Sequence, residues 1–111
     1  MSAHLSRLLI LEDPQRVPDN AGGFIETWQP LGEVWAEVTA RTGRGGDLGS
    51  VRTGQVAWRI VVRGAPVGVP SRPMPGQRFR EGARHYRIEA VAERDPAGSY
   101  LICYASEEVA A

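Results

Sequence analysis

The sequence predicts an all-β domain, built as a small antiparallel β-barrel or sandwich. Apolar and polar residues alternate with a period of two along most of the chain, which is typical of half-buried strands. The 13 glycines and 8 prolines suit many tight turns and are too many for a helical bundle. No segment offers ten residues with helical amphipathic periodicity. Because 111 residues can bury one modest core, we expect a single domain over residues 1–111.

The individual strands follow from the alternation and from the turn signals between them. Strands are predicted over residues 7–11, 23–28, 34–40, 55–63, 77–80, 85–93 and 100–106. Turns are predicted over residues 19–23, 81–83 and 95–98, the last of which would close a hairpin. Residues 64–75 hold four prolines and are predicted to form an extended surface connection.

Residues 42–53 (TGRGGDLGSVRT) break the alternation. With four glycines, two arginines and one aspartate, this segment has little to bury. At about 3.3 Å per residue it could reach out and back by roughly 20 Å. Loops of this length inside a compact domain are usually functional or disordered. We therefore expect a long, flexible, glycine-rich loop.

Charge and cysteine content exclude several classes of protein. Thirteen basic and thirteen acidic residues cancel, which does not indicate a basic nucleic-acid binder or a membrane-surface protein. The lone Cys103 excludes an intrachain disulfide and a four-cysteine zinc site. The early apolar run Leu8–Leu11 is too short for a signal peptide or a membrane span. We expect a soluble protein made in the cytoplasm, with no membrane partner.

Catalytic and metal-binding patterns are not indicated either. His4 and His85 lack metal-ligand spacing, and Cys103 falls within an apolar alternation. Glu107–Glu108 is interpreted as a solvated tail pair, and Gly43–Asp47 lacks the lysine and hydroxyl residue of a P-loop. We expect no enzyme, no cofactor and no metal site. A small hydrolase using Cys103 and His85 is the weakest alternative.

The aromatic residues allow two interpretations. They could form a base-stacking platform of the kind found in OB-folds, or they could fill the core. Because each lies within an apolar alternation, we favour the core for Trp58, Phe79, Tyr86 and Tyr100. Trp35 differs, since Glu33 and Glu37 share its face of the strand. We expect Trp35 at a rim or a protein interface, where tryptophan is enriched.

The basic residues, all of them arginines, fall into two groups. Arg41, Arg44 and Arg52 flank or lie in the glycine-rich loop, and four others cluster around one turn: Arg78, Arg80, Arg84 and Arg87. The simpler interpretation is a set of solvated strand faces whose arginines pair with Glu89, Glu93 and Asp95. The alternative is a ring of subunits that multiplies each charge into a girdle, which would hold DNA phosphates without reading sequence.

The order of several short motifs resembles one known family. Residues 19–28 (DNAGGFIETW) resemble the D-x-x-G-G-x-x-x-x-W opening of the bacteriophage head–tail joining proteins, also called head-closure or stopper proteins. Residues 34–38 (VWAEV) and 58–63 (WRIVVR) are similar to the next two strands of that family. Residues 78–79, 84–91 and Asp95 resemble its ending. The resemblance spans residues 5–108 in order.

This resemblance implies a structural protein of the virion, assembled in the bacterial cytoplasm. It implies a β-barrel that forms a ring of 6 or 12 copies in the neck of a tailed phage. The ring would sit below the portal and adaptor, and above the tail tube or tail terminator. The all-arginine composition suits a prophage or a gene transfer agent of a GC-rich bacterium.

The resemblance also assigns roles to particular residues. The long loop would line or gate the DNA channel, with four groups facing packaged double-stranded DNA: Arg41, Arg44, Asp47 and Arg52. Contacts with neighbouring subunits or partners are expected at Trp35, Glu37, Arg80 and Arg84. The residues by themselves leave open a small OB-like barrel that binds nucleic acid.

Overall fold

The computed structural model describes residues 3–41 and 54–108, and these form an all-β structure, as predicted. The six strands are β1 (Arg7–Pro18), β2 (Phe24–Ala40), β3 (Gln55–Arg63), β4 (Arg78–Glu81), β5 (Arg84–Glu93) and β6 (Tyr100–Glu108). Over the described residues there is no helix long and apolar enough to cross a membrane.

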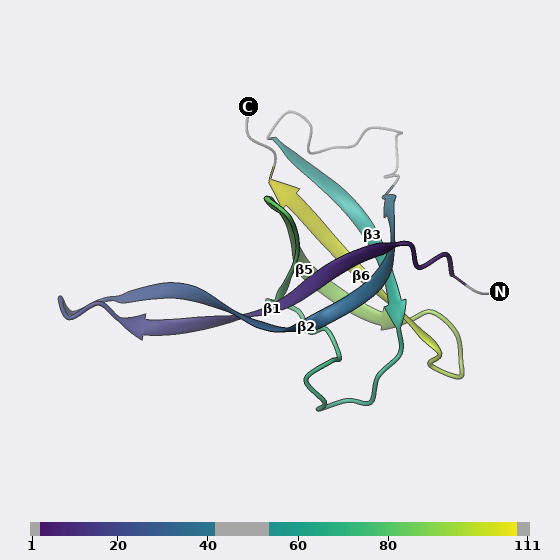
Figure 1. The fold of residues 1–111 in the computed structure, drawn as a ribbon, viewed down its shortest axis with the longest axis horizontal. Coiled ribbons are helices and arrows are strands. Elements are labelled where there is room, and N and C mark those ends of the chain that lie inside the picture. The colour runs from purple at the N-terminus through teal and green to yellow at the C-terminus, as the bar shows by residue number, and fades with distance from the viewer. Residues whose placement is uncertain (1–2, 42–53, 109–111) are drawn as a thin grey trace.

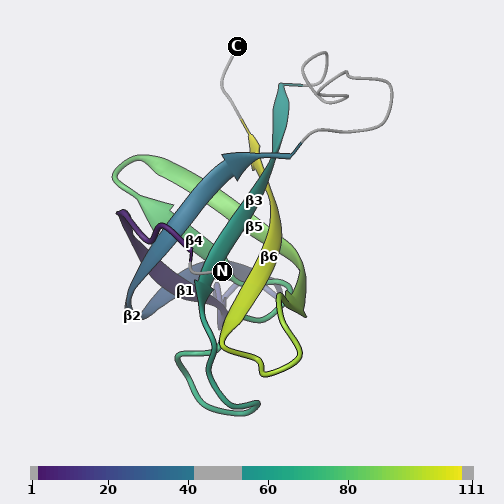
Figure 2. The same ribbon diagram turned by 90° about the vertical axis from the view of Figure 1, so that its right-hand side faces the viewer.

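The strands form one antiparallel sheet that closes into a barrel (Figures 1 and 2). Their order is β1-β2-β3-β6-β5-β4, and β4 pairs with β1 to complete the ring. Of the two architectures predicted, the chain therefore adopts the barrel. Closure gives the strands of the barrel body a partner on both sides, which protects their hydrogen-bonding edges.

The core fills the barrel with the inward-facing member of each alternating pair. Its fully buried residues include Leu9, Ile60, Phe79, Tyr86 and Cys103. Trp58 packs against this cluster and is partly buried, as predicted. The prediction for Tyr100 is wrong. Since Leu101 and Cys103 face inward on β6, Tyr100 belongs to the opposite face, where Arg94 lies 5.3 Å from its ring centroid.

β1 and β2 are much longer than predicted and extend beyond the barrel as a two-stranded arm, residues 12–30 (Figure 1). Pro14 and Pro30 lie inside these strands, although a proline usually ends one, and Pro18 is the last residue of β1. Their pairs are Glu12↔Pro30, Pro14↔Trp28 and Pro18↔Phe24. At the next position toward the turn, the Asp19 amide donates to the Gly23 carbonyl at 3.1 Å.

Hydrogen-bonded and non-hydrogen-bonded pairs alternate along an antiparallel ladder. The proline pairs therefore fall at positions where no N–H is needed, which is why the arm tolerates three prolines. The arm also explains the elongated shape. The radius of gyration is 15.0 Å, whereas a compact domain of this length has about 13 Å.

The predicted turns are present. At the arm tip the Asp19 carboxylate accepts hydrogen bonds from the amides of Ala21 and Gly23 at 2.8 and 2.9 Å. Asp95 does the same between β5 and β6, for Ser99 at 3.2 Å and Tyr100 at 3.1 Å. Residues 64–77 form no strand, in agreement with their prolines.

Candidate functional site

The end of the barrel that carries the junction between β2 and β3 is the candidate site. Arg44, Asp47 and Arg52 belong to residues 42–53 and lie outside the described residues. The described rim consists of the last residues of β2 and β6, the first residues of β3 and the turn between β4 and β5.

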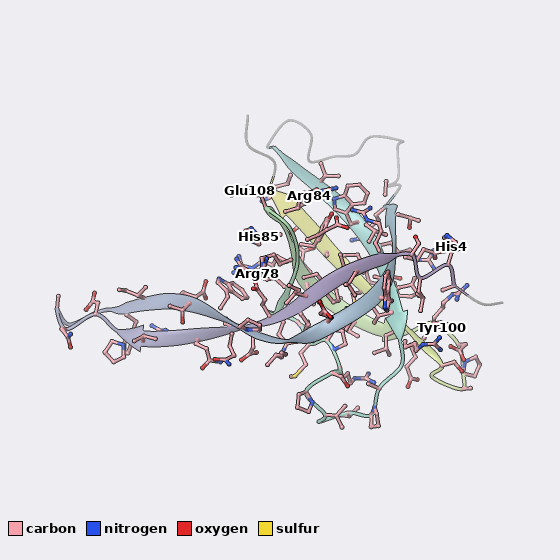
Figure 3. All side chains as sticks on the ribbon, in the orientation of Figure 1. His4, Arg78, Arg84, His85, Tyr100 and Glu108 are labelled. Carbon is pink, nitrogen blue, oxygen red and sulfur yellow. The ribbon has the colours of Figure 1, made fainter. Side chains whose placement is uncertain are left out.

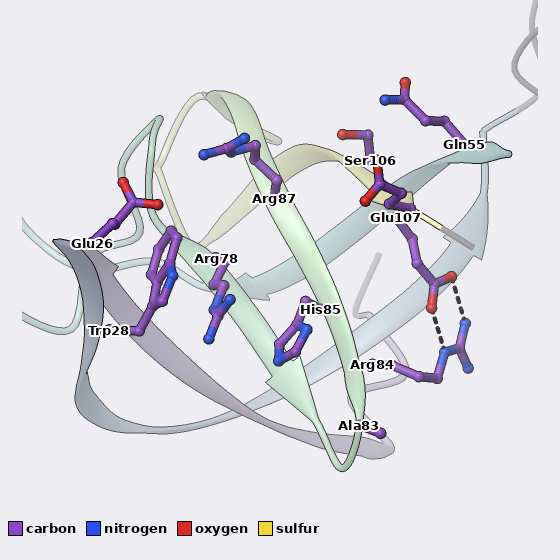
Figure 4. A pocket seen from close by; sticks show the side chains of 11 residues that line it. Glu26, Trp28, Gln55, Arg78, Ala83, Arg84, His85, Arg87, Ser106 and Glu107 are labelled. Carbon is purple, nitrogen blue, oxygen red and sulfur yellow. Dashed lines mark hydrogen bonds and ion pairs between the residues drawn. The ribbon is translucent and has the colours of Figure 1, made fainter. Parts of the chain in front are cut away.

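An inward-facing ion pair holds one side of the rim. The Arg84 guanidinium donates to both carboxylate oxygens of Glu107, with Nε–Oε2 at 2.7 Å and Nη2–Oε1 at 3.0 Å (Figure 4). Trp58 Nε1 donates to the same carboxylate at 2.9 Å. The hydrogen bonds from Arg84, and next to them that from Trp58, lower the pKa of Glu107 despite its burial.

A second ion pair lies beside the first, since Arg84 Nη1 is also 3.9 Å from Glu81 Oε1. Arg7 donates through Nη2 to Glu81 Oε1 and through Nε to Oε2 at 3.0 Å. The Tyr86 hydroxyl accepts from Arg7 at 3.0 Å and donates to Glu81 at 3.1 Å. The hydrogen bond from Arg7 lowers the pKa of Glu81, and burial raises that of Tyr86 to about 12.

We call these six residues the barrel-end cluster: Arg7, Trp58, Glu81, Arg84, Tyr86 and Glu107. An arginine lowers the pKa of each carboxylate in it, and burial raises the pKa of Tyr86. Each carboxylate of the cluster is thus paired with an arginine of the same chain. The chemistry of the cluster is that of a rigid polar rim above an apolar core.

The interpretation of Glu107 as a solvated tail residue is therefore wrong, because Glu107 is 7% exposed and ion-paired. The alternation could have located it: Leu101, Cys103 and Ala105 face inward on β6, and residue 107 continues the same parity.

A separate ion cluster joins the arm to the barrel. Glu12, only 4% exposed, accepts from Arg78 Nε at 2.7 Å and from Arg80 Nε at 3.0 Å. The Arg78 guanidinium also lies 4.1 Å from the ring centroid of Trp28. We call Glu12, Arg78 and Arg80 the arm-root cluster. It ties the first residues of the arm to β4.

The expected pairing of these arginines with Glu89, Glu93 and Asp95 is wrong. Their partners are instead Glu12, Glu81 and Glu107. The expected partners were the acids that follow these arginines most closely along the chain. At the arm root, barrel closure between β1 and β4 brings in a single acid, Glu12, which is 66 residues from Arg78 and 68 from Arg80 in sequence.

A groove of about 600 Å³ runs between the arm and the barrel wall (Figure 4). Its lining mixes acids, arginines and one histidine: Glu26, Trp28, Gln55, Arg78, Ala83, Arg84, His85, Arg87, Ser106, Glu107 and Glu108. Partial loss of hydration, and next to it the charge of Arg78, lowers the pKa of His85. The groove carries both signs of charge and is not a site for one anion.

The predicted interface residues lie in three places. Trp35 is 55% exposed on the outer face of β2, and Glu37 on the same face accepts from the His4 amide at 3.1 Å. Arg80 belongs to the arm-root cluster and Arg84 to the barrel-end cluster. The structure thus brings Trp35 and Glu37 together and engages both arginines inside the chain.

Arg41 lies on the outer wall beside the junction. Its amide donates to the Ala57 carbonyl at 3.0 Å, and its guanidinium lies 5.0 Å from the centroid of the Tyr104 ring. The side chain is exposed, so it can reach a partner or a phosphate from that wall.

The residues that an OB-like nucleic-acid binder or a Cys103–His85 hydrolase would use are not arranged for those functions. Trp58 and Tyr86 meet inside the barrel in an edge-to-face arrangement, with centroids 6.1 Å apart, and cannot stack on bases. Cys103 faces the core, and burial raises its pKa to about 12, whereas His85 is exposed on β5. Over the described residues, no group of three or more potential metal ligands gathers.

The comparison with known families covers nearly the whole chain. The family model of phage head completion proteins matches residues 1–108. The chain belongs to the phage head completion protein family. The family resemblance inferred from the motifs is thereby confirmed, and so is the expected place in a phage-type virion. Head completion proteins are structural proteins and are not known as an enzyme family.

Two solved structures resemble this head completion protein. A chain in "Virion of native gene transfer agent (GTA) particle" is 55% identical, with a TM-score of 0.80, covering 99% of this chain and 100% of that one. The solution structure of protein SF1141 from Shigella flexneri 2a is 19% identical with a TM-score of 0.62, covering 93% of this chain and 92% of that one. The second likeness shows a shared fold only. No match was found among curated proteins.

Proposed function

We propose that this head completion protein is a ring subunit of the head–tail connector in a gene transfer agent or related phage-like particle. It would join the portal and adaptor complex to the tail, without catalysis. The observation that carries the proposal is the 55% identity, over essentially both full lengths, to a chain of a native gene transfer agent virion.

The physical properties of the barrel support this role. A connector must hold its shape under load from packaged DNA, and a closed sheet with ion clusters at its mouth and at its arm root is a rigid unit. In the barrel-end cluster both carboxylates are paired with arginines, which suits a structural role. Exposed residues on the outer face of the barrel, such as Trp35, and on the arm suit contacts with partners.

We further propose that the barrel end with the β2–β3 junction faces the DNA channel. Arg41 is the described residue of that proposal, and its exposed guanidinium on the outer wall suits contact with a phosphate. For Arg44, Asp47 and Arg52 the proposal rests on the sequence. A ring of 6 or 12 neutral chains would still line a channel with arginines, since net charge does not determine local charge.

Deletion of the gene tests the connector role. Particles from the deletion strain should contain DNA-filled heads that lack tails or lose DNA, and the wild-type gene should restore tailed particles. Normal tailed particles without the protein would refute the proposal.

The channel orientation is tested separately by complementation. The triple variant R41A/R44A/R52A should restore tails but retain less DNA than wild type, measured as nuclease-protected DNA per particle. R94A is the control, because Arg94 follows the end of β5 opposite the junction, where its amide donates to the carbonyl of Tyr100 at the start of β6. Equal DNA retention by both variants would contradict the orientation and leave the connector role intact.

A further inference from the structure

The tip of the arm is unusually apolar for a free surface. Val17, Phe24 and Ile25 are 45%, 59% and 55% exposed. Val17 lies directly opposite Ile25 in the ladder, and the guanidinium of Arg16 lies 4.6 Å from the ring centroid of Phe24. A two-stranded ribbon gains little stability by exposing three large apolar side chains, so the tip has the composition of a contact surface.

A small apolar pocket lies on another part of the molecule. It has a volume of about 260 Å³ and opens where β2 and β3 diverge, beyond the pair Ala36↔Val62. Its lining, which we call the acceptor pocket, consists of Leu5, Glu33, Val34, Trp35, Val62, Arg63, Gly64, Ala65 and Ser71.

The acceptor pocket and the arm tip lie at opposite ends of the molecule. Figure 3 shows His4 and Tyr100 at the end of the molecule farthest from the arm. Leu5 of the pocket follows His4, and Arg63 of the pocket pairs with Tyr100. A chain therefore cannot fill its own pocket with its own arm tip, but a neighbouring copy can.

Size and charge match between the two surfaces. A volume of about 260 Å³ equals roughly nine waters at about 30 Å³ each, which suits one or two large apolar side chains. Beside the tip, Arg16 and Glu26 face each other across the ladder, and the pocket rim carries Glu33 and Arg63. One basic and one acidic group on each surface can pair in the docked state.

We propose that the arm tip of one copy inserts Phe24 and Ile25 into the acceptor pocket, beside Trp35, of the next copy. Because tip and pocket are different surfaces, the contact is heterologous, and repeating it around an axis closes a ring. This inference rests on the proposed function, which requires a ring, and it specifies the residues that join the subunits.

Disulfide trapping in assembled particles tests the contact. Cys103 is fully buried, so the chain offers a background nearly free of reactive thiols. The double variant F24C/W35C, oxidised in purified particles, should give a ladder of covalent oligomers on a non-reducing gel, ending at the ring's copy number. I25C/L5C is a second pair across the same contact, for use if the first disturbs assembly.

Matched variants separate the possible outcomes. F24C alone, W35C alone and V67C/W35C should give no ladder, since Val67 is 85% exposed but lies outside both surfaces. A dimer from F24C alone would show a tip-to-tip contact. A crosslink from F24C to a different virion protein would show that the arm serves another partner. Either result, or no crosslink from either cysteine pair, overturns the proposal.

The test also distinguishes failure of the inference from failure of the proposed function. If the chain is present in particles but forms no ladder, the arm contact is wrong and the connector role stands. If the chain is absent from particles, the connector role is wrong. The arm contact is then tested on the concentrated purified chain, where F24S/I25S should weaken self-association at least about tenfold relative to V67S.

Discussion

Replacing Glu107 by glutamine tests whether the barrel-end cluster stabilises the fold. The variant E107Q keeps the size of the side chain and removes its charge. Arg84 would lose its bidentate ionic partner, and Trp58 Nε1 would compete with Arg84 for a single amide oxygen. E108Q is the matched control, because Glu108 is the next residue, is exposed and faces away from the core.

The magnitude follows from the exposure of the pair. Hydrogen bonds to charged groups contribute about 1.5–3 kcal/mol. The Arg84 side chain is 43% exposed, so water replaces part of what is lost, and we expect about 1.5–2 kcal/mol of destabilisation. A domain of 111 residues has an unfolding entropy of about 0.23 kcal/mol/K, so Tm should fall by about 6–9 °C.

Thermal unfolding followed by circular dichroism measures this difference. E107Q should melt about 6–9 °C below wild type, and E108Q within about 2 °C of it. A second readout uses tryptophan fluorescence, since Trp58 contacts the mutated group and should change its emission in E107Q alone. If E107Q and E108Q melted at the same temperature, the cluster would contribute nothing to stability.

Three further predictions concern the loop that follows β3, the core and the arm root. A Cβ on Gly64 would lie 1.9 Å from the Gly98 carbonyl oxygen, so G64A should lose about 2 kcal/mol in a denaturant titration, and A65G less than about 1 kcal/mol. The Cys103 thiol, with a pKa raised to about 12 by burial, should react with a thiol reagent at least about a hundredfold more slowly in the native chain than in denaturant; equal rates would show that the core is open. Burial alone would raise the pKa of Glu12, but hydrogen bonds from two arginines outweigh it and lower that pKa below its ordinary value of 4.5. The unfolded chain then binds the proton first as pH falls, so the Tm advantage of wild type over E12Q should persist near neutral pH and shrink below about pH 4.5; a pH-independent difference would contradict this account.

Local pattern was sufficient for much of the fold, for a reason that particular strands illustrate. Along 85–88 every second residue is apolar, and a period of two places Tyr86 and Ile88 on the buried face. Past the irregularity between Ile88 and Ala90 the parity shifts, and Val91 packs against the core in place of Ala90. On β6 the same parity places Glu107 on the face of Leu101 and Cys103 and Tyr100 on the opposite face. The turns were predicted because Asp19 and Asp95 can bind backbone amides locally.

The arm was not predictable in this way. Prolines 14, 18 and 30 normally end strands, and whether a proline is tolerated depends on which residue faces it across the ladder. That register is set by the partner strand and by the irregularity between Leu11 and Glu12. Local sequence does not contain it.

The sequence by itself determined the strand alternation, the turns, the absence of net charge and the ordered motifs of a head completion protein, because each of these is a property of neighbouring residues. Only the tertiary structure decided that the sheet closes through β1 and β4, which acids the arginines meet, and where the arm tip lies relative to the acceptor pocket. These features join residues far apart in the chain. Their positions follow from barrel closure and strand register, which are set by packing of the whole core.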